Sequence, residues 1–454
     1  MRTSRGRLSA VVVACAVTTL VAYPAGVADA APVDNAGERS AVTTWLRHHA
    51  HPANSLPSGV PSPALRPVRA VVDDAVVVGL GAAAEGAREL GTSAQGVTRY
   101  LVQTKGFRSI AIEDDWTAGV LLNRYLRTDD GNLRDLVAHM APRFRTPQML
   151  RLVHWVRRYN RTHPEALRFV GIDATSTRAL AYDAVIDYVR KAAPDRLADL
   201  RADYGPITPH TDNIWDYNDY FYNEVRDKEK YVRLAEKGYR LVKELPVDHG
   251  SEGYRLALHN AYTIMAYYTF AARHPRGYRD QLMAHNLVWW RHRTGDKIVA
   301  LSAIVHTAVD QDLGLSYPPR PLRTMKTAGA YLRDRYGHRY VSIGFTFGHG
   351  AVTSGIATGR PRRYAVPPPS DGEVGHVLGR TRWRCYLLDL DEAALPVVRK
   401  WLNGPTEIRV INIGSYDPAR SGEYFMGDGS LRQWFDAVIH TRRVTASRLL
   451  GHPR

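Results

Sequence analysis

The stretch that decides the fold is VVVGLGAAAEGAREL, residues 76–90. It starts with a run of β-branched residues, passes through a glycine turn and continues into a segment with helical spacing. Such a turn presents the first backbone N–H groups of the helix, which have no partners within the helix. The stretch therefore predicts a buried strand that ends beside a binding site, with Glu85 as the acid in the turn.

Strands and helices alternate outward from this stretch. Continuous apolar runs predict the first five buried strands, and shorter runs predict three more in the tail: residues 75–80, 107–116, 166–174, 296–306 and 339–350, then 382–390, 406–414 and 434–440. Helical spacing predominates between them. This alternation predicts an α/β fold with a central, mostly parallel sheet flanked by helices. Residues 180–275 are largely helical and are predicted to form a helical lobe.

The first thirty residues have the features of a secretory signal peptide. A basic start precedes an apolar stretch over residues 8–27, and small residues follow at Ala28 and Ala30. We expect cleavage after Ala30, which leaves residues 31–454 as one secreted α/β domain. Lipid attachment through Cys15 is the alternative. No later segment approaches the roughly twenty apolar residues of a membrane span.

The charge pattern bears on possible binding partners, and the cysteine content bears on whether disulfides can stabilise the fold. The formal net charge is +16 at pH 7, and loss of residues 1–30 removes three arginines and one aspartate. The basic residues are scattered along predicted helices without a compact run, which indicates a basic surface and no nucleic-acid partner. Cys385 would be the single cysteine after cleavage, so an ordinary core must stabilise the fold.

Polar side chains lie where the predicted strands end. Glu85 follows the first strand, Glu113 lies near the end of the second, Asp173 ends the third and His306 ends the fourth. In open α/β sheets ligands bind at the carboxyl ends of the strands. We therefore expect these four side chains to line one crevice that binds a small molecule.

Two further features are candidates for ligand contact. The aromatic segment NIWDYNDYFYNE, residues 213–224, offers Trp215, Tyr217 and Tyr220 for a lid over the ligand. The alternative is a helix that packs its aromatic face into the core. His349, in FGHG, either faces the crevice or lies in a loop.

We predict neither cofactor nor metal. Gly79, Gly81 and Gly86 do not have the spacing of a dinucleotide-binding loop. No group of histidine, cysteine and aspartate has metal-ligand spacing, although Glu85, Glu113 and His306 would suit a divalent ion if they met in space. The sequence leaves the oligomeric state open.

The order of these motifs resembles the erythromycin esterase family. That family has a strand followed by Gly-Glu-x-x-His-Gly and a helix with an acid near its start, and GAAAEG with Glu89 occupies this place. The resemblance continues over most of the chain through GFRSIAIEDD, LVHWVRRYN, FVGIDA, RDQLMAHN, DKIVALSAIVH, TAGAYLRDRYG and WFDAVI. It implies the family fold and a hydrolase that acts on an ester or lactone bond.

The resemblance also implies that the family's site is partly replaced. Its acid after the second strand is kept as Glu113, and the second of two histidines after the fourth strand is kept as His306. Four polar positions of the family carry a different residue here: the turn glutamate falls on Ala82, the water-activating histidine on Glu85, a helix arginine on Ala94 and the first histidine on Ala303.

Two hypotheses follow. In the first, the protein is a hydrolase in which Glu85 is the base, His306 the proton donor, and Glu113 strengthens the base by like-charge repulsion. In the second, it is an inactive family member that binds a small molecule or glycan outside the cell, because loss of several members of a catalytic unit costs powers of ten in rate.

Overall fold

The computed structural model describes residues 36–53, 63–128, 131–356, 361–393 and 395–451. The predicted signal peptide, with Cys15, lies outside these ranges. Within them, no helix is long and apolar enough to cross a membrane.

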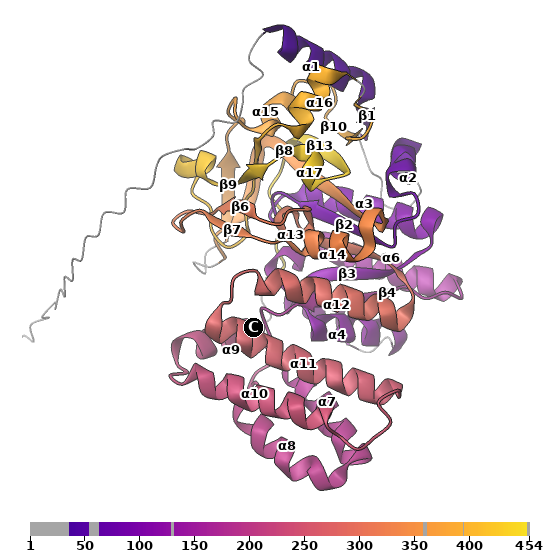
Figure 1. Cartoon of the computed structure of the whole chain (residues 1–454), viewed down its shortest axis with the longest axis vertical. Coiled ribbons are helices and arrows are strands. Elements are labelled where there is room, and N and C mark those ends of the chain that lie inside the picture. The colour runs from indigo at the N-terminus through magenta and orange to yellow at the C-terminus, as the bar shows by residue number, and fades with distance from the viewer. Residues whose placement is uncertain (1–35, 54–62, 129–130, 357–360, 394, 452–454) are drawn as a thin grey trace, which may run out of the picture.

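The central sheet has the order β1-β10-β13-β8-β2-β5-β3-β4, and β9 pairs with β8. The six strands from β13 to β4 are parallel to their neighbours, whereas β1, β10 and β9 add antiparallel pairs at one end (Figure 1). The strands are His51–Pro52 (β1), Val77–Ala82 (β2), Phe107–Asp115 (β3), Arg168–Asp173 (β4), Lys297–Ala303 (β5), Tyr340–Ser354 (β8), Arg362–Val366 (β9), Cys385–Asp389 (β10) and Ala437–Val444 (β13). The predicted fold class, a large sheet flanked by helices, is confirmed.

Helices cover both faces of the sheet, which explains the continuous apolar runs of its strands. Val78 and Val299 point to one face and belong to the same core cluster as helices α3 and α6. Their neighbours Val77 and Ile298 point to the other face and pack with α12 and α14. These four helices are Arg88–Lys105 (α3), Pro147–Thr162 (α6), Tyr278–Thr294 (α12) and Ala328–Tyr336 (α14).

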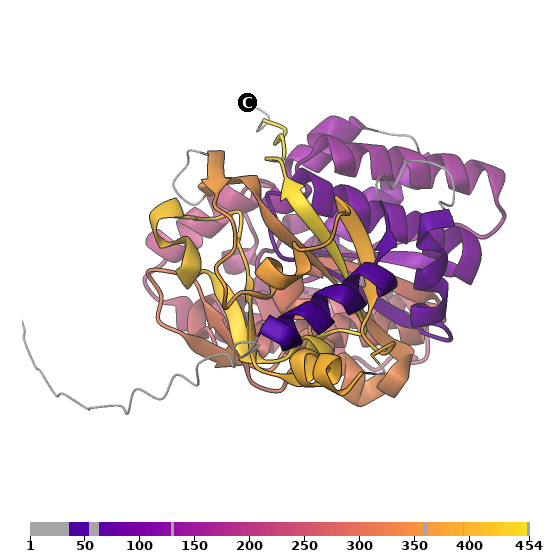
Figure 2. The same ribbon diagram turned by 90° about the horizontal axis from the view of Figure 1, so that it is seen from above.

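The remaining elements of the body lie around this core. Helix α1 lies across the antiparallel end of the sheet, against C-terminal elements (Figure 2). The helices are Ala36–His49 (α1), Arg66–Val72 (α2), Trp116–Thr128 (α4), Leu133–Ala138 (α5), Pro142–Phe144 (η2, a 3-10 helix), Ile304–Thr307 (α13), Val374–Leu378 (α15), Pro396–Asn403 (α16) and Leu431–Trp434 (α17).

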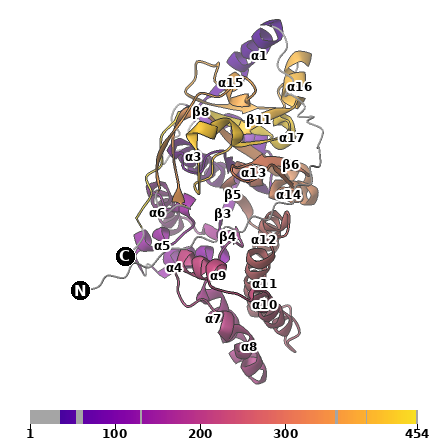
Figure 3. The ribbon, with the colours of Figure 1, turned by 90° about the vertical axis from the view of Figure 1, so that its left-hand side faces the viewer.

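Helices α7 to α11 form a lobe that projects from the sheet (Figures 1 and 3). They are Ala179–Ala192 (α7), Leu197–Tyr204 (α8), Ile214–Asn223 (α9), Lys228–Lys243 (α10) and Glu252–Arg273 (α11). The lobe has its own apolar cluster, which is rich in buried tyrosines such as Tyr182, Tyr204, Tyr267 and Tyr268. Its helices therefore pack mainly on one another.

A second, small sheet was not predicted. It is antiparallel, with the order β11-β12-β6-β7, and consists of Thr406–Arg409 (β11), Phe425–Gly429 (β12), Leu313–Ser316 (β6) and Arg323–Met325 (β7). Only part of the predicted strand at residues 406–414 is a strand, and it belongs to this sheet. Strands of three to five residues carry too little periodicity to stand out from loops.

Backbone pairing fixes the turn GAAAEG. The Ile411 N–H donates to the Ala83 carbonyl at 2.8 Å, and the Glu85 N–H donates to the Ile411 carbonyl at 3.1 Å. A Cβ at Gly81 would overlap Thr307 of α13, so glycine is needed there for α13 to lie against β2. The first residue of α3, Arg88, donates its N–H to the Thr445 carbonyl, and this helix start is therefore covered by the chain.

Candidate functional site

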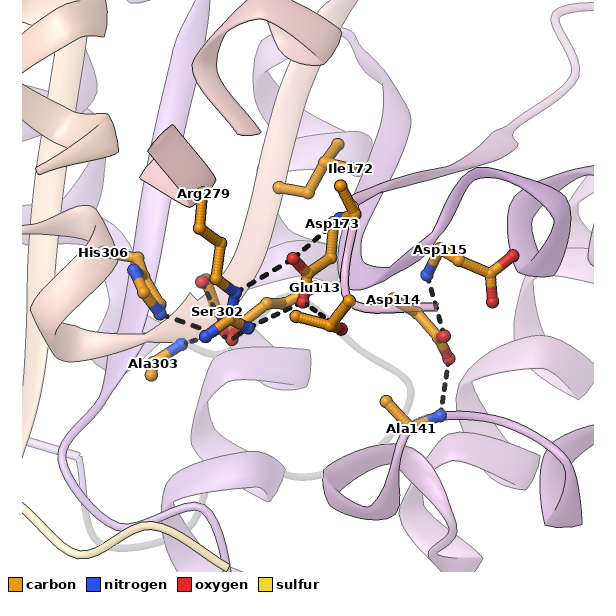
Figure 4. Close-up of polar contacts among 12 residues, drawn as sticks. Glu113, Asp114, Asp115, Ala141, Ile172, Asp173, Arg279, Ser302, Ala303 and His306 are labelled. Carbon is orange, nitrogen blue, oxygen red and sulfur yellow. Dashed lines mark hydrogen bonds and ion pairs between the residues drawn. The ribbon is translucent and has the colours of Figure 1, made fainter. Parts of the chain in front are cut away.

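The carboxyl ends of the parallel strands open into a cavity of about 330 Å³, the central cavity. Four side chains predicted from the strand ends line it together, namely Glu85, Glu113, Asp173 and His306. They come from four different strand–loop junctions, after β2, at β3, at β4 and after β5. Figure 4 shows three of them, Glu113, Asp173 and His306, gathered around Arg279.

Glu113 is the most buried group of this site, with a fully covered side chain. Its Oε2 accepts hydrogen bonds from the Ser302 hydroxyl at 2.6 Å and from the Ala303 N–H at 2.7 Å. Both donors belong to the last residues of β5, the neighbouring strand in the sheet. Parallel pairing of β3 with β5 therefore holds the carboxylate in a fixed position.

Three cations surround the same carboxylate. Arg143 forms an ion pair with its Oε2, Arg279 reaches Oε1 at 2.6 Å, and Nε2 of His306 lies 3.5 Å from Oε1. Burial alone would raise the pKa of Glu113, but the charges of Arg143, His306 and Arg279 outweigh it and hold this pKa well below its usual range. Glu113 is therefore ionised at neutral pH and accepts hydrogen bonds without serving as a base.

Arg279 joins Glu113 to Asp173. It lies in the first turn of α12, and its Nε and Nη2 contact the two oxygens of Asp173 at 2.9 and 2.6 Å. Burial opposes ionisation of Asp173, but the charge and hydrogen bonds of Arg279 lower its pKa below the ordinary value. The bidentate geometry is the strong form of this ion pair, so Arg279 links the ends of β3 and β4.

His306 lies on the short helix α13, directly after β5. Its Nδ1 is 2.8 Å from Oδ1 of Asp280, which also accepts the N–H of Ala328. Burial alone would lower the pKa of His306, but the carboxylates of Asp280 and Glu113 outweigh burial and raise it. The charged form of the imidazole, which is a proton donor, therefore persists to higher pH than in an ordinary histidine.

Glu85 forms an ion pair with Arg143, whereas the sequence predicts repulsion from the like charge of Glu113. Nη2 of Arg143 binds Oε1 of Glu85 at 2.9 Å while Nη1 of the same guanidinium contacts Glu113. The other oxygen of Glu85 accepts the N–H of Ile413 at 2.9 Å. The prediction that Glu113 strengthens Glu85 by like-charge repulsion is wrong, because Arg143 lies between the two carboxylates and compensates both.

The aromatic candidates separate into two groups. Trp215 lines the central cavity, and its ring lies 5.2 Å from the guanidinium of Arg145. Tyr217 is buried in the core of the lobe and donates its hydroxyl to the Ile207 carbonyl, away from the cavity. Tyr220 faces a shallow hollow beside Trp215 and bonds to Tyr231. Tyr217 and Tyr220 of helix α9 thus pack with the lobe, whereas Trp215 stays a candidate for ligand contact.

His349 lies inside β8 and not after it. Its register partner is Arg443 on β13, and it does not line the central cavity. The strand continues to Ser354, about four residues beyond the predicted end, because β9 pairs with this extension. His349 is therefore part of a strand and is not in a loop at the crevice.

Sequence reasoning missed Arg143, Arg279 and Asp280. Three buried carboxylates in one crevice require cations, because an unpaired buried charge is costly, so arginines should have been sought. Arg279 and Asp280 open the motif RDQLMAHN, at the start of a helix. Arg143 lies in the short 3-10 helix η2, and no local pattern marks it.

Asp114, next to Glu113, positions the loop that carries Arg143. Its Oδ2 accepts the N–H of Ala141 at 2.7 Å, two residues before Arg143, and its Oδ1 accepts the N–H of Asp115 (Figure 4). Burial and the charge of Asp115 raise the pKa of Asp114 to about 7. The end of β3 therefore supplies one acid to the cavity and another to its supporting loop.

A second, smaller cavity of about 80 Å³ adjoins the first, and we call it the alanine pocket. It is lined by Ala82, Ala94 and Ala303, three positions at which the resemblance places a glutamate, an arginine and a histidine. Glu85, Arg143 and Ala303 line both cavities. The surface of the pocket is mainly apolar, with Leu80, Ala84, Ala87, Phe144, Met149 and Leu301 in its wall. Six polar residues also line it, namely Arg88, Gln95, Thr146, Gln148, Ser302 and Ser447.

This fold and this arrangement of strand-end groups place the chain in a known class. The sequence profile of the erythromycin esterase family matches residues 102–444, most of the chain. The chain belongs to the erythromycin esterase family. No group of three or more His, Cys, Asp or Glu side chains in the described ranges is arranged to hold a metal ion.

Individual proteins are similar to this chain in sequence or in fold. An erythromycin esterase type II from Escherichia coli is 24% identical over 315 residues, which cover 62% of this chain and 71% of that protein. A Bacillus cereus protein of known structure is 25% identical with a TM-score of 0.78 and covers 90% of this chain and 99% of its own. The open conformation of a mutant erythromycin esterase, EreC, shares the fold with a TM-score of 0.68 at 16% identity, over 89% and 99% of the two chains.

Proposed function

We propose that the protein hydrolyses an ester or lactone bond by attack of a water molecule in the central cavity. The observation that carries the proposal is that the Glu85 carboxylate, bound by Arg143, lines one cavity together with Arg279 and His306. Hydrolysis needs a base for the water proton and positive groups for the oxyanion that develops on the carbonyl. The cavity contains both kinds of group.

In the proposed reaction, Glu85 takes a proton from water as the oxygen attacks the carbonyl carbon. The negative charge that forms on the carbonyl oxygen is stabilised by the arginines of the cavity. When the intermediate collapses, the C–O bond to the alcohol breaks and His306 donates a proton to the leaving oxygen. The products are a carboxylic acid and an alcohol, and Glu85 and His306 then exchange protons with solvent.

The second candidate is ligand binding without turnover. Two features favour it: both oxygens of Glu85 already accept N–H donors, and alanine stands at three positions where the resemblance implies polar residues. A water molecule must compete with these donors for the carboxylate oxygens. The arginine-rich cavity would then bind an anionic or strongly polar ligand.

Turnover separates the two candidates. We would incubate the purified protein with macrolactones and with simple esters and follow ring-opened or cleaved products by mass spectrometry. Product formation that follows saturation kinetics supports the hydrolase. Saturable binding in calorimetry, with no product after prolonged incubation, supports the binding protein.

We also propose that the protein is exported, on the basis of the basic start, the apolar stretch and the small residues before position 31. N-terminal sequencing of protein recovered from the culture medium should begin at Ala31. Recovery in the cell fraction with Met1 intact would contradict export, and a lipid-modified Cys15 would replace it with the lipoprotein alternative.

The charge on His306 gives the activity an expected pH dependence. Its raised pKa extends the charged, proton-donating form to higher pH than in an ordinary histidine, and kcat should therefore fall as the pH rises through this raised value. His306→Gln should lower kcat by about 10²-fold or more and remove this alkaline limb. The measurement is the pH–rate profile of both proteins, and an alkaline limb that persists in the variant would assign it to another group.

The cavity wall predicts a preference for anionic substrates. Four arginines and His306 face only three carboxylates there, and Arg320 and Arg323 are exposed at its edge. Arg323→Gln should lower kcat/KM about three- to tenfold for an ester that carries a carboxylate, and the loss should shrink at high salt. A neutral ester should be unaffected. Arg276→Gln, outside the central cavity, is the control, and equal losses for both esters would contradict the prediction.

A further inference from the structure

The walls of the alanine pocket differ in polarity from those of the central cavity. The central cavity is lined by charged side chains, whereas the alanine pocket is walled mainly by apolar groups from β2, α3, β5 and α6. Ala82, Ala94 and Ala303 contribute only methyl groups where longer polar side chains would fill the space. Such truncation leaves an apolar hollow directly beside the proposed reaction centre.

An apolar hollow of this kind suits an apolar ligand group. A cavity of about 150 Å³ with apolar walls stays dry and takes benzene, and the alanine pocket has about 80 Å³. By that comparison the alanine pocket has room for roughly half of a benzene molecule, or about three carbon atoms. Water gains few hydrogen bonds along most of this wall, so its displacement favours binding.

The two cavities meet at a charged boundary. Glu85, Arg143 and Ala303 line both, and the Arg143 guanidinium binds both Glu85 and Glu113 there. A short chain in the alanine pocket would thus place the atom at its end beside Arg143. A carbonyl or carboxylate is the group that a guanidinium binds well.

We propose that the alanine pocket receives the alkyl chain of a short aliphatic acyl group, of the butyryl kind, whose carbonyl lies at Arg143. This inference rests on the proposed function for assigning the pocket to the acyl half of an ester. The alcohol half then occupies the larger, cationic central cavity. A carboxylic acid of the same chain length, the product of such a reaction, binds in the same orientation without any turnover.

The first test measures binding of the straight-chain carboxylates from acetate to octanoate to the purified protein by ligand-observed NMR titration. Affinity should rise about fourfold for each added methylene up to butyrate, because each buried CH₂ contributes that factor. It should stop rising or fall for longer chains. Affinity without chain-length dependence, or no binding at all, would overturn the proposal.

Filling the pocket provides the second test. Ala94→Leu, on α3, should weaken butyrate binding at least tenfold and leave acetate binding little changed. Ala82→Val fills the pocket from the β2 side. It provides a second, independent variant if Ala94→Leu folds poorly. Ala184→Leu is the matched control, because Ala184 is an exposed residue of α7 beside a different cavity. Butyrate binding that is unchanged in both pocket variants would overturn the proposal.

The two proposals fail in different ways. If butyrate binds and Ala94→Leu weakens it, but no ester is hydrolysed, hydrolysis is refuted and the pocket assignment stands for a bound acyl group. If esters are hydrolysed at rates that depend neither on acyl length nor on the residue at position 94, the pocket assignment is refuted and hydrolysis stands.

Discussion

Replacing Glu85 with glutamine is expected to lower kcat for ester or lactone hydrolysis by about 10²- to 10⁴-fold, the usual contribution of a general base. Glutamine has nearly the same shape as glutamate, and its carbonyl oxygen still accepts the Ile413 N–H or a bond from Arg143. It cannot take a proton from water. Because the substrate contacts remain, KM should change by no more than about threefold.

Glu89→Gln is the control for this experiment. Glu89 lies four residues further along the same segment, binds Thr445 and lines neither cavity. Its replacement should leave kcat unchanged. If Glu85→Gln retains full activity in a steady-state assay, the base lies elsewhere and the proposed mechanism is wrong. If wild type and variant are equally inactive but bind the same ligand, the binding protein is the correct interpretation.

The central sheet could be predicted from sequence because its strands are buried on both faces. The runs at β2, β3, β4 and β5 are nearly continuous in apolar residues, and the first three are each followed by a helical pattern. The small sheet could not be predicted, because its four strands are short. Some of them also pair with strands that are distant in the sequence, as β6 does with β12. Helix α13 was missed for a related reason, because four residues give no helical period.

The carboxylates of the site could be predicted and their electrostatics could not. Glu85, Glu113 and Asp173 follow from the rule that parallel strands end at one edge of a sheet. Their charges depend on partners from distant segments, namely Arg143 from η2 and Arg279 from α12. With the acids alone visible, repulsion between Glu85 and Glu113 was a reasonable expectation. In the structure Arg143 lies between the two carboxylates and binds both.

Replacing Arg279 with methionine should be the most destabilising single change at the site, with a loss of about 3–5 kcal/mol in the free energy of unfolding at neutral pH. The guanidinium contacts two carboxylates, Glu113 and Asp173, whose side chains are almost fully buried. Methionine preserves much of the volume of the side chain and removes the charge. Among the described residues, Asp173 would keep its bonds from the Ala174 N–H and the Thr175 hydroxyl.

Urea denaturation at several pH values checks this expectation. The lowered pKa values of Glu113 and Asp173 mean that their contribution is present above the ordinary carboxylate pKa of about 4 and is lost as the pH falls below it. The penalty of Arg279→Met should therefore be largest near pH 7 and shrink toward pH 3, because carboxylates that have lost Arg279 have a higher pKa and can protonate there. Arg276→Met, which breaks an exposed pair with Asp312, should cost less than about 1 kcal/mol. A penalty for Arg279→Met that is equally small, or that is constant with pH, would show that the buried carboxylates do not depend on this arginine.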